Sequence, residues 1–359
     1  FCQEFSLFAT KSPRHGNFVV VLPRYDENRT PARKGKTLTE DAFEHSAAKM
    51  RDNGMTDMAI AQFKRLYEVW RSEEASTWIR EDDVEPLVGV PSFHDVYETI
   101  NHDKAVDAFA KTAFLKLNGG LGTSMGLDCA KSLLPVRRHK ARQMRFIDII
   151  IGQVLTARTR LGVELPLTLM NSFRTSNDTM KVLRANKKFH QEDIPLEIVQ
   201  HQEPKIGAET GLPVSFPANP ELEWCPPGHG DLFSTIWESG LLDVLEEKGF
   251  KYLFISNSDN LGARPSRTLA QHFENTGAPF MIEVAKRTPA DRKGGHIFRH
   301  RAASTMAAGN IPSPVISAAL GHSSPKSLDA YLYADMEHNR ECSISLKKYP
   351  VSKEVISLG

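Results

Sequence analysis

The spacing of hydrophobic positions changes near residue 110 of the chain. Before it, apolar residues recur at helical intervals from Met58 to Trp70, and the polar triplet Thr39–Asp41 is typical of a helix start. After it, short apolar runs alternate with longer amphipathic stretches. The pattern predicts a helical N-terminal segment over residues 38–110, followed by an α/β region.

Five apolar runs in the second region have the length and composition of buried strands: Thr112–Leu117, Pro166–Met170, Leu196–Val199, Lys251–Ser256 and Phe280–Val284. Two stretches with helical spacing lie between them, Ile147–Arg160 and Leu232–Glu247. Strands that alternate with helices predict a mostly parallel sheet with helices on both faces. In such sheets, ligands bind at the carboxyl ends of the strands. Residues 1–37 receive no assignment, although the run Phe18–Leu22 suits a strand.

Composition narrows the class of protein without naming a partner. The 359 residues hold 45 Lys and Arg against 44 Asp and Glu, so the charge favours neither nucleic acid nor membrane. The length and the 40% of hydrophobic residues suit about two globular domains. The chain has no apolar run of about 18 residues and no signal-peptide profile, which argues against a membrane protein. Its first residue is Phe1, not Met, which indicates a fragment or a processed product.

The four cysteines lie far apart in the sequence, at positions 2, 129, 225 and 342. This spacing excludes a CxxC metal motif and a dense disulfide framework. We therefore expect a reducing, cytoplasmic location.

The strongest local signal is a glycine-rich stretch directly after the strand predicted from Thr112. It runs from Asn118 to Gly126 and precedes the pair Lys131–Ser132, which we expect on the following helix. Glycines let backbone N–H groups approach phosphate oxygens, a helix N-terminus adds positive charge, and a lysine supplies a cation. Neither a Walker loop nor a GxGxxG loop fits, because Ala130 and Met125 stand where glycine is required. Alone, the stretch suits a phosphate-binding loop and a structural turn equally.

Three other stretches place polar groups beyond the predicted strands. The Gly228–His229 pair follows two prolines, while Asp259 and Gln200 each come shortly after an apolar strand. An imidazole can contact a ligand, a carboxylate can hold a phosphate-bound Mg²⁺, and an amide can bind the edge of a base. The alternatives are a structural histidine at position 229 and a loop cap at position 259.

Together these stretches resemble one family, the UTP–glucose-1-phosphate uridylyltransferases, also called UDP-glucose pyrophosphorylases. The resemblance spans about residues 39–295. Its motifs are Leu117–Gly126 with Lys131–Ser132, Met170–Phe173, Gln200 with Pro204, Pro226–Asp231, Ser256–Ala263, Lys286–Thr288, Ala290–Asp291 and Lys293–Gly295. It implies an α/β fold with a mixed, mostly parallel sheet, in which residues 111–295 form a Rossmann-like nucleotidyltransferase core.

The same resemblance implies uridylyl transfer from UTP to glucose 1-phosphate, which yields UDP-glucose and pyrophosphate with Mg²⁺ as cofactor. It assigns catalysis to Lys131, His229 and Asp259, and metal binding to Asp259. It assigns nucleotide binding to Leu117, Gly119, Gly120, Lys131, Gln200, Gly228 and Asn257. A phosphate nucleophile is largely ionised near neutral pH, so the reaction needs positioning and charge neutralisation more than a strong base.

Residues 296–359 depart from the family pattern. Four residues of this segment resemble the carboxyl end of a tyrosine recombinase domain. They are His296, Arg299, His322 within a Gly-His pair, and Tyr331 nine residues after it. That resemblance implies an α-helical segment in which Arg299 and the two histidines bind a phosphate that Tyr331 attacks. It predicts a junction near residue 295 between a truncated transferase core and a foreign segment.

Three functions therefore stay open: a uridylyltransferase impaired by truncation, a DNA recombinase fragment, and an inactive nucleotide-binding protein. DNA is a partner only in the second. The last 64 residues hold seven Lys and Arg against five Asp and Glu, a weak charge for DNA binding. The near-neutral charge favours the transferase.

Overall fold

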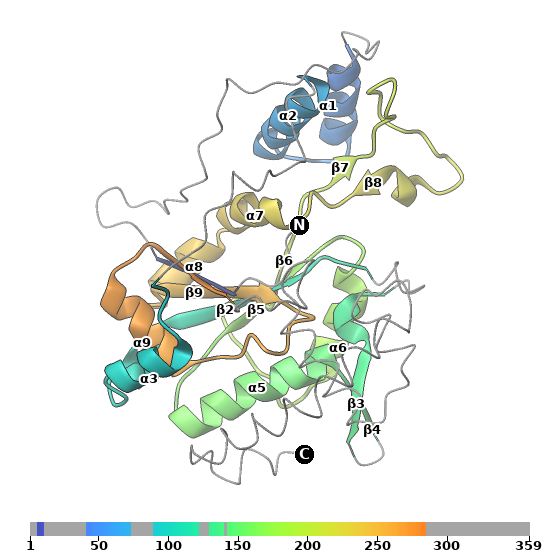
Figure 1. Cartoon of the computed structure of the whole chain (residues 1–359). Coiled ribbons are helices and arrows are strands. Elements are labelled where there is room, and N and C mark those ends of the chain that lie inside the picture. Colours follow the sequence, from blue (N-terminus) through green and yellow to red (C-terminus); the bar gives the residue numbers. More distant parts are fainter. Residues whose placement is uncertain (1–5, 11–40, 73–88, 122–128, 140–141, 285–359) are drawn as a thin grey trace, which may run out of the picture.

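The computed structural model describes residues 6–10, 41–72, 89–121, 129–139 and 142–284. At its centre lies a six-stranded sheet (Figure 1), and the strands are β1 (Ser6–Thr10), β2 (Thr112–Asn118), β5 (Leu167–Asn171), β6 (Glu197–Val199), β9 (Tyr252–Asn257) and β10 (Phe280–Glu283). Their spatial order is β10-β1-β9-β2-β5-β6. Strand β1 is antiparallel to both neighbours, whereas the other adjacent strands pair in parallel. The mostly parallel α/β sheet predicted from the sequence is confirmed.

The order of the parallel strands locates a binding edge. The parallel strands occur along the chain in the order β2, β5, β6, β9, but they lie in the sheet in the order β6-β5-β2-β9. This is the order of a doubly wound sheet, in which the winding reverses between β2 and β9. Ligands bind at that switch point, beyond the carboxyl ends of the strands. Here the switch point lies beyond Asn118 of β2 and Asn257 of β9.

Helices cover both faces of the sheet, because side chains alternate along each strand between two hydrophobic clusters. Phe114 and Phe254 belong to one cluster, whereas Leu115 and Ile255 belong to the other. The first cluster also contains residues of α4 (Ala105–Ala110), α5 (Phe146–Leu161), α6 (Ser176–Ala185) and α9 (Arg267–Thr276), and the second contains residues of α7 (Leu232–Glu238) and α8 (Leu241–Glu247). Figure 1 shows α5 and α7 on opposite sides of the sheet.

The N-terminal helices form a third cluster beyond the edge of the sheet (Figure 1). Helices α1 (Ala42–Asp52) and α2 (Asp57–Ser72) pack through Phe63 and Tyr67 around Trp224, which lies in a short hairpin. The hairpin consists of β7 (Glu203–Pro204) and β8 (Trp224–Cys225), preceded by the 3₁₀ turn η4 (Pro220–Glu223). Lys49 of α1 pairs with Glu223 and donates a hydrogen bond to the carbonyl oxygen of Val214 (2.8 Å). The elements between α2 and β2 that the structure describes are α3 (Phe93–Thr99) and α4.

Two details of the helix predictions are wrong. The stretch Leu232–Glu247 forms two helices, because Gly240 between them has φ 68°, a left-handed conformation that a right-handed helix cannot include. The helix expected at Lys131 is only the 3₁₀ turn η3 (Lys131–Leu133). Pro135 follows closely and favours extended backbone at Leu134, where φ is −64° and ψ is 138°.

The turn η3 leads into the hairpin of β3 (Pro135–His139) and β4 (Arg142–Arg145), after which α5 begins. The predicted strand Phe18–Leu22 lies outside the described residues, and β1 was not predicted. Among the described helices, none is both long enough and apolar enough to cross a membrane.

Candidate functional site

A series of buried polar side chains joins the carboxyl ends of three parallel strands. Asn118 at the end of β2 donates a hydrogen bond from Nδ2 to Oδ1 of Asn171 at the end of β5 (2.7 Å). Ser258, just beyond β9, donates from Oγ to Oδ1 of Asn118 (2.7 Å), and Asn171 donates from Nδ2 to Oε2 of Glu197 (2.8 Å). Because these groups satisfy one another away from water, they hold the strand ends in a defined register.

Gly119, Gln200 and Gly228, three of the predicted nucleotide-binding residues, meet at this edge. A methyl group at Gly119 would overlap the side-chain oxygen of Gln200, a residue that is only 4% exposed. Gln200 donates from Nε2 to the carbonyl oxygen of Gly228 (2.8 Å). Gly228 has φ 98°, which favours glycine. The three residues come from separate segments, and each glycine meets a local requirement.

Leu117 and Asn257, also predicted to bind nucleotide, are partners in the pairing of β2 with β9. The backbone N–H of Ser258 donates to the carbonyl oxygen of Leu117 (2.9 Å), which extends this pairing by one bond. Both residues therefore lie at the switch point of the sheet. Their backbone pairing fixes the strand ends at which the candidate site lies.

The residues on either side of positions 122–128 lie next to each other. Leu121 and Ala130 form an antiparallel bridge, and the N–H of Lys131 donates to the carbonyl oxygen of Gly120 (3.2 Å). Residues 122–128 between them lie outside the described part of the chain. The backbone thus places Lys131 at the end of β2, although no extended helix follows it.

A cation, a carboxylate and an imidazole share one part of this edge. The Nζ atom of Lys131 lies 3.8 Å from Oδ2 of Asp259, and both side chains are 33% exposed. Burial lowers the pKa of His229, Asp259 raises it, and Lys131 lowers it again. The three predicted catalytic residues are therefore close enough to interact. A neutral imidazole is favoured near neutral pH, and it can donate a hydrogen bond to an anion without a change of charge.

A buried lysine that the sequence reasoning missed supports the segment around Asp259. Lys116 of β2 is 2% exposed, and its Nζ donates to Oγ of Ser256 (2.7 Å) and to the carbonyl oxygen of Ala263 (2.9 Å). Burial lowers the pKa of Lys116 to about 7, against a smaller upward effect of Asp259. The sequence signal that could have identified it is a lysine inside an apolar strand, because such a side chain requires hydrogen-bond partners in the interior.

The donor set of the edge fits a magnesium ion only together with a substrate phosphate. Within the described residues, no group of three or more His, Cys, Asp or Glu side chains is arranged to hold a metal. Magnesium is commonly held by one or two carboxylates and by phosphate oxygens of the substrate. Asp259, partly exposed beyond β9, supplies one such carboxylate. Lys131 beside it also attracts phosphate.

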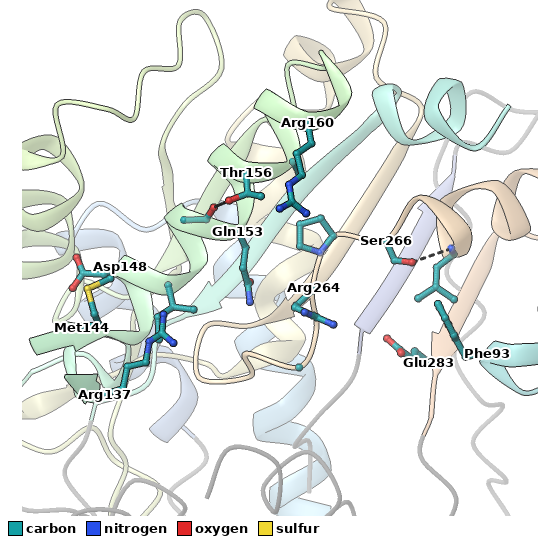
Figure 2. Close-up of a pocket in the computed structure, with 16 residues that line it drawn as sticks. Phe93, Arg137, Met144, Asp148, Gln153, Thr156, Arg160, Arg264, Ser266 and Glu283 are labelled. Atoms are coloured by element: carbon teal, nitrogen blue, oxygen red, sulfur yellow. Dashed lines mark hydrogen bonds between the residues drawn. The ribbon is translucent and has the colours of Figure 1, made fainter. Parts of the chain in front are cut away.

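A separate pocket of about 750 Å³ lies between α5 and the segment after Asp259. Figure 2 shows Gln153 and Thr156 of α5 lining it, together with Arg264 and Ser266. None of the predicted site residues lines this pocket. Gln153 connects the pocket to the segment after Asp259, because it donates from Nε2 to the carbonyl oxygen of Leu261 (3.3 Å).

The four recombinase-like residues, His296, Arg299, His322 and Tyr331, lie outside the described residues, as do the motifs over 286–295. A family model described as UTP–glucose-1-phosphate uridylyltransferase matches residues 60–308. The match includes most of α2, every later described element and the candidate edge, and it continues past the junction expected near residue 295. It lends no support to the recombinase interpretation.

Individual proteins show the same similarity. The chain is 40% identical over 205 residues to the probable UTP–glucose-1-phosphate uridylyltransferase of Schizosaccharomyces pombe, which is 56% of this chain and 39% of the relative. It is 35% identical over 247 residues to the uridylyltransferase of Encephalitozoon cuniculi, which is 68% of this chain and 47% of the relative. The chain therefore spans less than half the length of these two relatives.

Solved structures also match a large part of the chain. A mutant of the UDP-glucose pyrophosphorylase of Leishmania major in complex with UDP-glucose superimposes with a TM-score of 0.63 at 36% identity, covering 71% of this chain and 52% of that chain. A structure from Trypanosoma brucei, described as UDP-glucose phosphorylase, gives 0.64 at 34% identity, covering 71% and 53%.

Proposed function

Because the chain belongs to the UTP–glucose-1-phosphate uridylyltransferase family, we propose that it binds UTP and glucose 1-phosphate at the carboxyl edge of its sheet and converts them to UDP-glucose and pyrophosphate. One observation supports this activity most directly: Lys131, His229 and Asp259 meet beyond the ends of β2 and β9. Three segments distant in sequence thus bring a cation, an imidazole and a carboxylate to the edge where doubly wound sheets bind nucleotides.

We assign recognition of the uracil base to Gln200 and Gly228. The amide nitrogen of Gln200 donates one of its two N–H groups to the carbonyl oxygen of Gly228, which leaves the second N–H and the side-chain oxygen to bind the base. Gly119 provides the space in which that oxygen lies. Leu117, Gly120 and Asn257, at the ends of the two strands, border the rest of the nucleotide in this assignment.

The proposed reaction is an in-line displacement at the α-phosphorus of UTP. A phosphate oxygen of glucose 1-phosphate forms the new P–O bond, the bond from the α-phosphorus to the bridging oxygen breaks, and pyrophosphate leaves. The attacking phosphate has its second pKa at about 6, so it needs no general base near neutral pH. Lys131 neutralises phosphate charge, and His229 donates a hydrogen bond to a phosphate oxygen. When bound, Mg²⁺ supplies further charge neutralisation on the phosphates, and Asp259 is the residue that holds it.

Calorimetry with UTP tests the assignment of Asp259. We expect the chain to bind UTP more tightly with Mg²⁺ than without it, and Asp259→Asn to lose most of this difference, about tenfold in affinity or about 1.4 kcal/mol. Asp178→Asn is the matched control, because Asp178 is an exposed carboxylate on α6 that pairs with Lys181. Absence of UTP binding, or binding that Asp259→Asn leaves unchanged, contradicts the proposal.

A second assay separates the enzyme from an inactive nucleotide-binding protein. We expect release of pyrophosphate only when UTP, glucose 1-phosphate and Mg²⁺ are all present. UTP binding without release of pyrophosphate would support the nucleotide site but contradict the transferase activity.

A further inference from the structure

The imidazole of His201 bridges two carboxylates beside the candidate nucleotide site. Its Nδ1 lies 2.7 Å from Oδ1 of Asp231, and its Nε2 contacts Oε2 of Glu238. The ring is largely buried, with 12% of the side chain exposed. A carboxylate oxygen only accepts hydrogen bonds, so both ring nitrogens can be bonded to ionised carboxylates only when both carry hydrogen. The geometry therefore describes an imidazolium.

Asp231 accepts hydrogen bonds from several donors besides this ring. Its carboxylate is 1% exposed and also accepts from the backbone N–H of His201 (2.9 Å) and from Oγ1 of Thr235 (3.0 Å). Gln62 of α2 adds a longer contact at 3.5 Å. These donors fix the position of the carboxylate that the ring of His201 contacts.

The same contacts join the two segments assigned to base recognition. His201 follows Gln200 directly, and Asp231 ends the turn that begins after Gly228, η5 (His229–Asp231). Gln200 links these segments through a hydrogen bond from its Nε2 to the carbonyl oxygen of Gly228. The pairing of β7 with β8 also joins them nearby, and the His201 bridge adds two charge-assisted contacts.

We propose that His201 is a positioning residue of the nucleotide site, which as an imidazolium between Asp231 and Glu238 holds Gln200 and Gly228 in register for the base. The inference rests on the proposed function for the identity of the ligand, whereas the bridge itself belongs to the unliganded chain. Loss of the imidazolium proton breaks one of the two contacts and loosens the register. Nucleotide affinity consequently depends on pH.

The charged groups that face His201 determine the sign of this dependence. They are Asp231 from η5, Glu238 from α7 and Glu203 from β7, while α2 contributes the neutral Gln62. The hydrogen bond to Asp231 raises the pKa of His201, against the opposing effect of burial. A histidine whose pKa is raised by folding keeps its contacts fully at pH values below its ordinary pKa of about 6.5. It loses them as pH rises through the raised pKa.

Glu203 also changes its charge near neutral pH. Burial and the charge of Asp231 raise its pKa to about 7, and His201 opposes this shift. Its ionisation on the alkaline side adds a negative charge that favours the imidazolium. The variants His201→Gln and Glu203→Gln therefore separate the two titrations.

The first measurement needs no nucleotide. In NMR titrations of the histidine side chains of the full chain, the resonance lost in His201→Gln should titrate above the ordinary value of about 6.5, and Glu238→Gln should move it downward. A resonance for His201 that titrates at or below the ordinary value, unaffected by Glu238→Gln, overturns the bridge.

The second measurement is calorimetry with UDP-glucose between pH 6 and pH 9, chosen because its esterified phosphates do not titrate in this range. We expect affinity to fall as pH rises, and His201→Gln to bind about five- to tenfold more weakly at pH 6.5 with a shallower pH dependence. Glu238→Gln should shift affinity in the same direction, Glu203→Gln should retain the slope, and His190→Gln should match the unmodified chain. Unchanged affinity or a retained slope in His201→Gln overturns the positioning role.

The two measurements distinguish the inference from the proposed function. If the unmodified chain fails to bind UDP-glucose, the proposed function is wrong, and the positioning of a nucleotide falls with it. The NMR titration then still decides whether the imidazolium bridge exists. If the chain binds UDP-glucose and His201→Gln binds equally well, only the inference is wrong.

Discussion

Gly119 is the residue at which the candidate site tolerates least change. A methyl group there would overlap the oxygen of Gln200, which is buried and held by its 2.8 Å bond to Gly228. Gly119→Ala forces Gln200 to move, so we expect a loss of about 1–3 kcal/mol in the free energy of unfolding. We also expect the loss of UDP-glucose binding. Urea denaturation and calorimetry measure the two effects.

Gly120→Ala is the matched control for unfolding. A methyl group at Gly120 meets no atom within 4 Å, so the steric penalty should be absent. Equal destabilisation by the two substitutions would show that backbone flexibility, not contact with Gln200, explains the effect at Gly119.

Lys116 gives the fold a pH dependence that its replacement should remove. Burial lowers its pKa from 10.5 to about 7, so between these values the unfolded chain binds more protons and the folded state gains stability as pH rises. In urea denaturation at pH 7, 8 and 9, the stability of the unmodified chain relative to Lys116→Met should grow by up to about 1 kcal/mol per pH unit. A difference independent of pH would contradict the depressed pKa.

At the scale of elements, α1 and α2 form with the β7–β8 hairpin a hydrophobic cluster distinct from the two clusters of the sheet. Phe63→Ala removes a 6% exposed side chain from the middle of this cluster and should cost about 3–5 kcal/mol locally. Hydrogen exchange should accelerate in α1 and α2 while β2, β5 and β9 keep their protection.

Phe273→Ala is the matched comparison for this prediction. Phe273 of α9 is 1% exposed and belongs to a cluster of the sheet, so its removal should accelerate exchange in the strands. Identical exchange patterns for the two variants would mean that the clusters unfold as one unit.

At the scale of the whole molecule, the candidate site is assembled from several parts of the fold. Gln62 of α2 contacts Asp231, Gln200 follows β6, and Asp259 follows β9. A ligand at this edge should therefore stabilise the entire folded chain. At a hundred times its dissociation constant, UDP-glucose should add about 2.7 kcal/mol to the free energy of unfolding.

Thermal unfolding at increasing UDP-glucose concentration measures this stabilisation. The midpoint should rise with concentration for the unmodified chain and stay constant for Gly119→Ala. An equal rise in both would place the ligand away from Gln200 and Gly119.

Local patterns predicted most of the elements around the site. The apolar runs from Thr112 and Lys251 became β2 and β9, because a strand buried on both faces needs consecutive apolar residues. The division of Leu232–Glu247 into α7 and α8 was missed, since helical spacing continues across Gly240 although its backbone does not. The helix expected at Lys131 is only a short turn, because Pro135 favours extended backbone at Leu134.

The sequence by itself determined the fold class and the candidate residues, because strand and helix periodicities and polar groups beyond strands are local features. Only the tertiary structure decided which of these residues meet. The Lys131–Asp259 contact, the space that Gly119 leaves for Gln200, the partners of Lys116 and the bridge of His201 all join segments distant in sequence or buried atoms. Such contacts depend on strand order and on packing across the sheet, and no local pattern specifies either one.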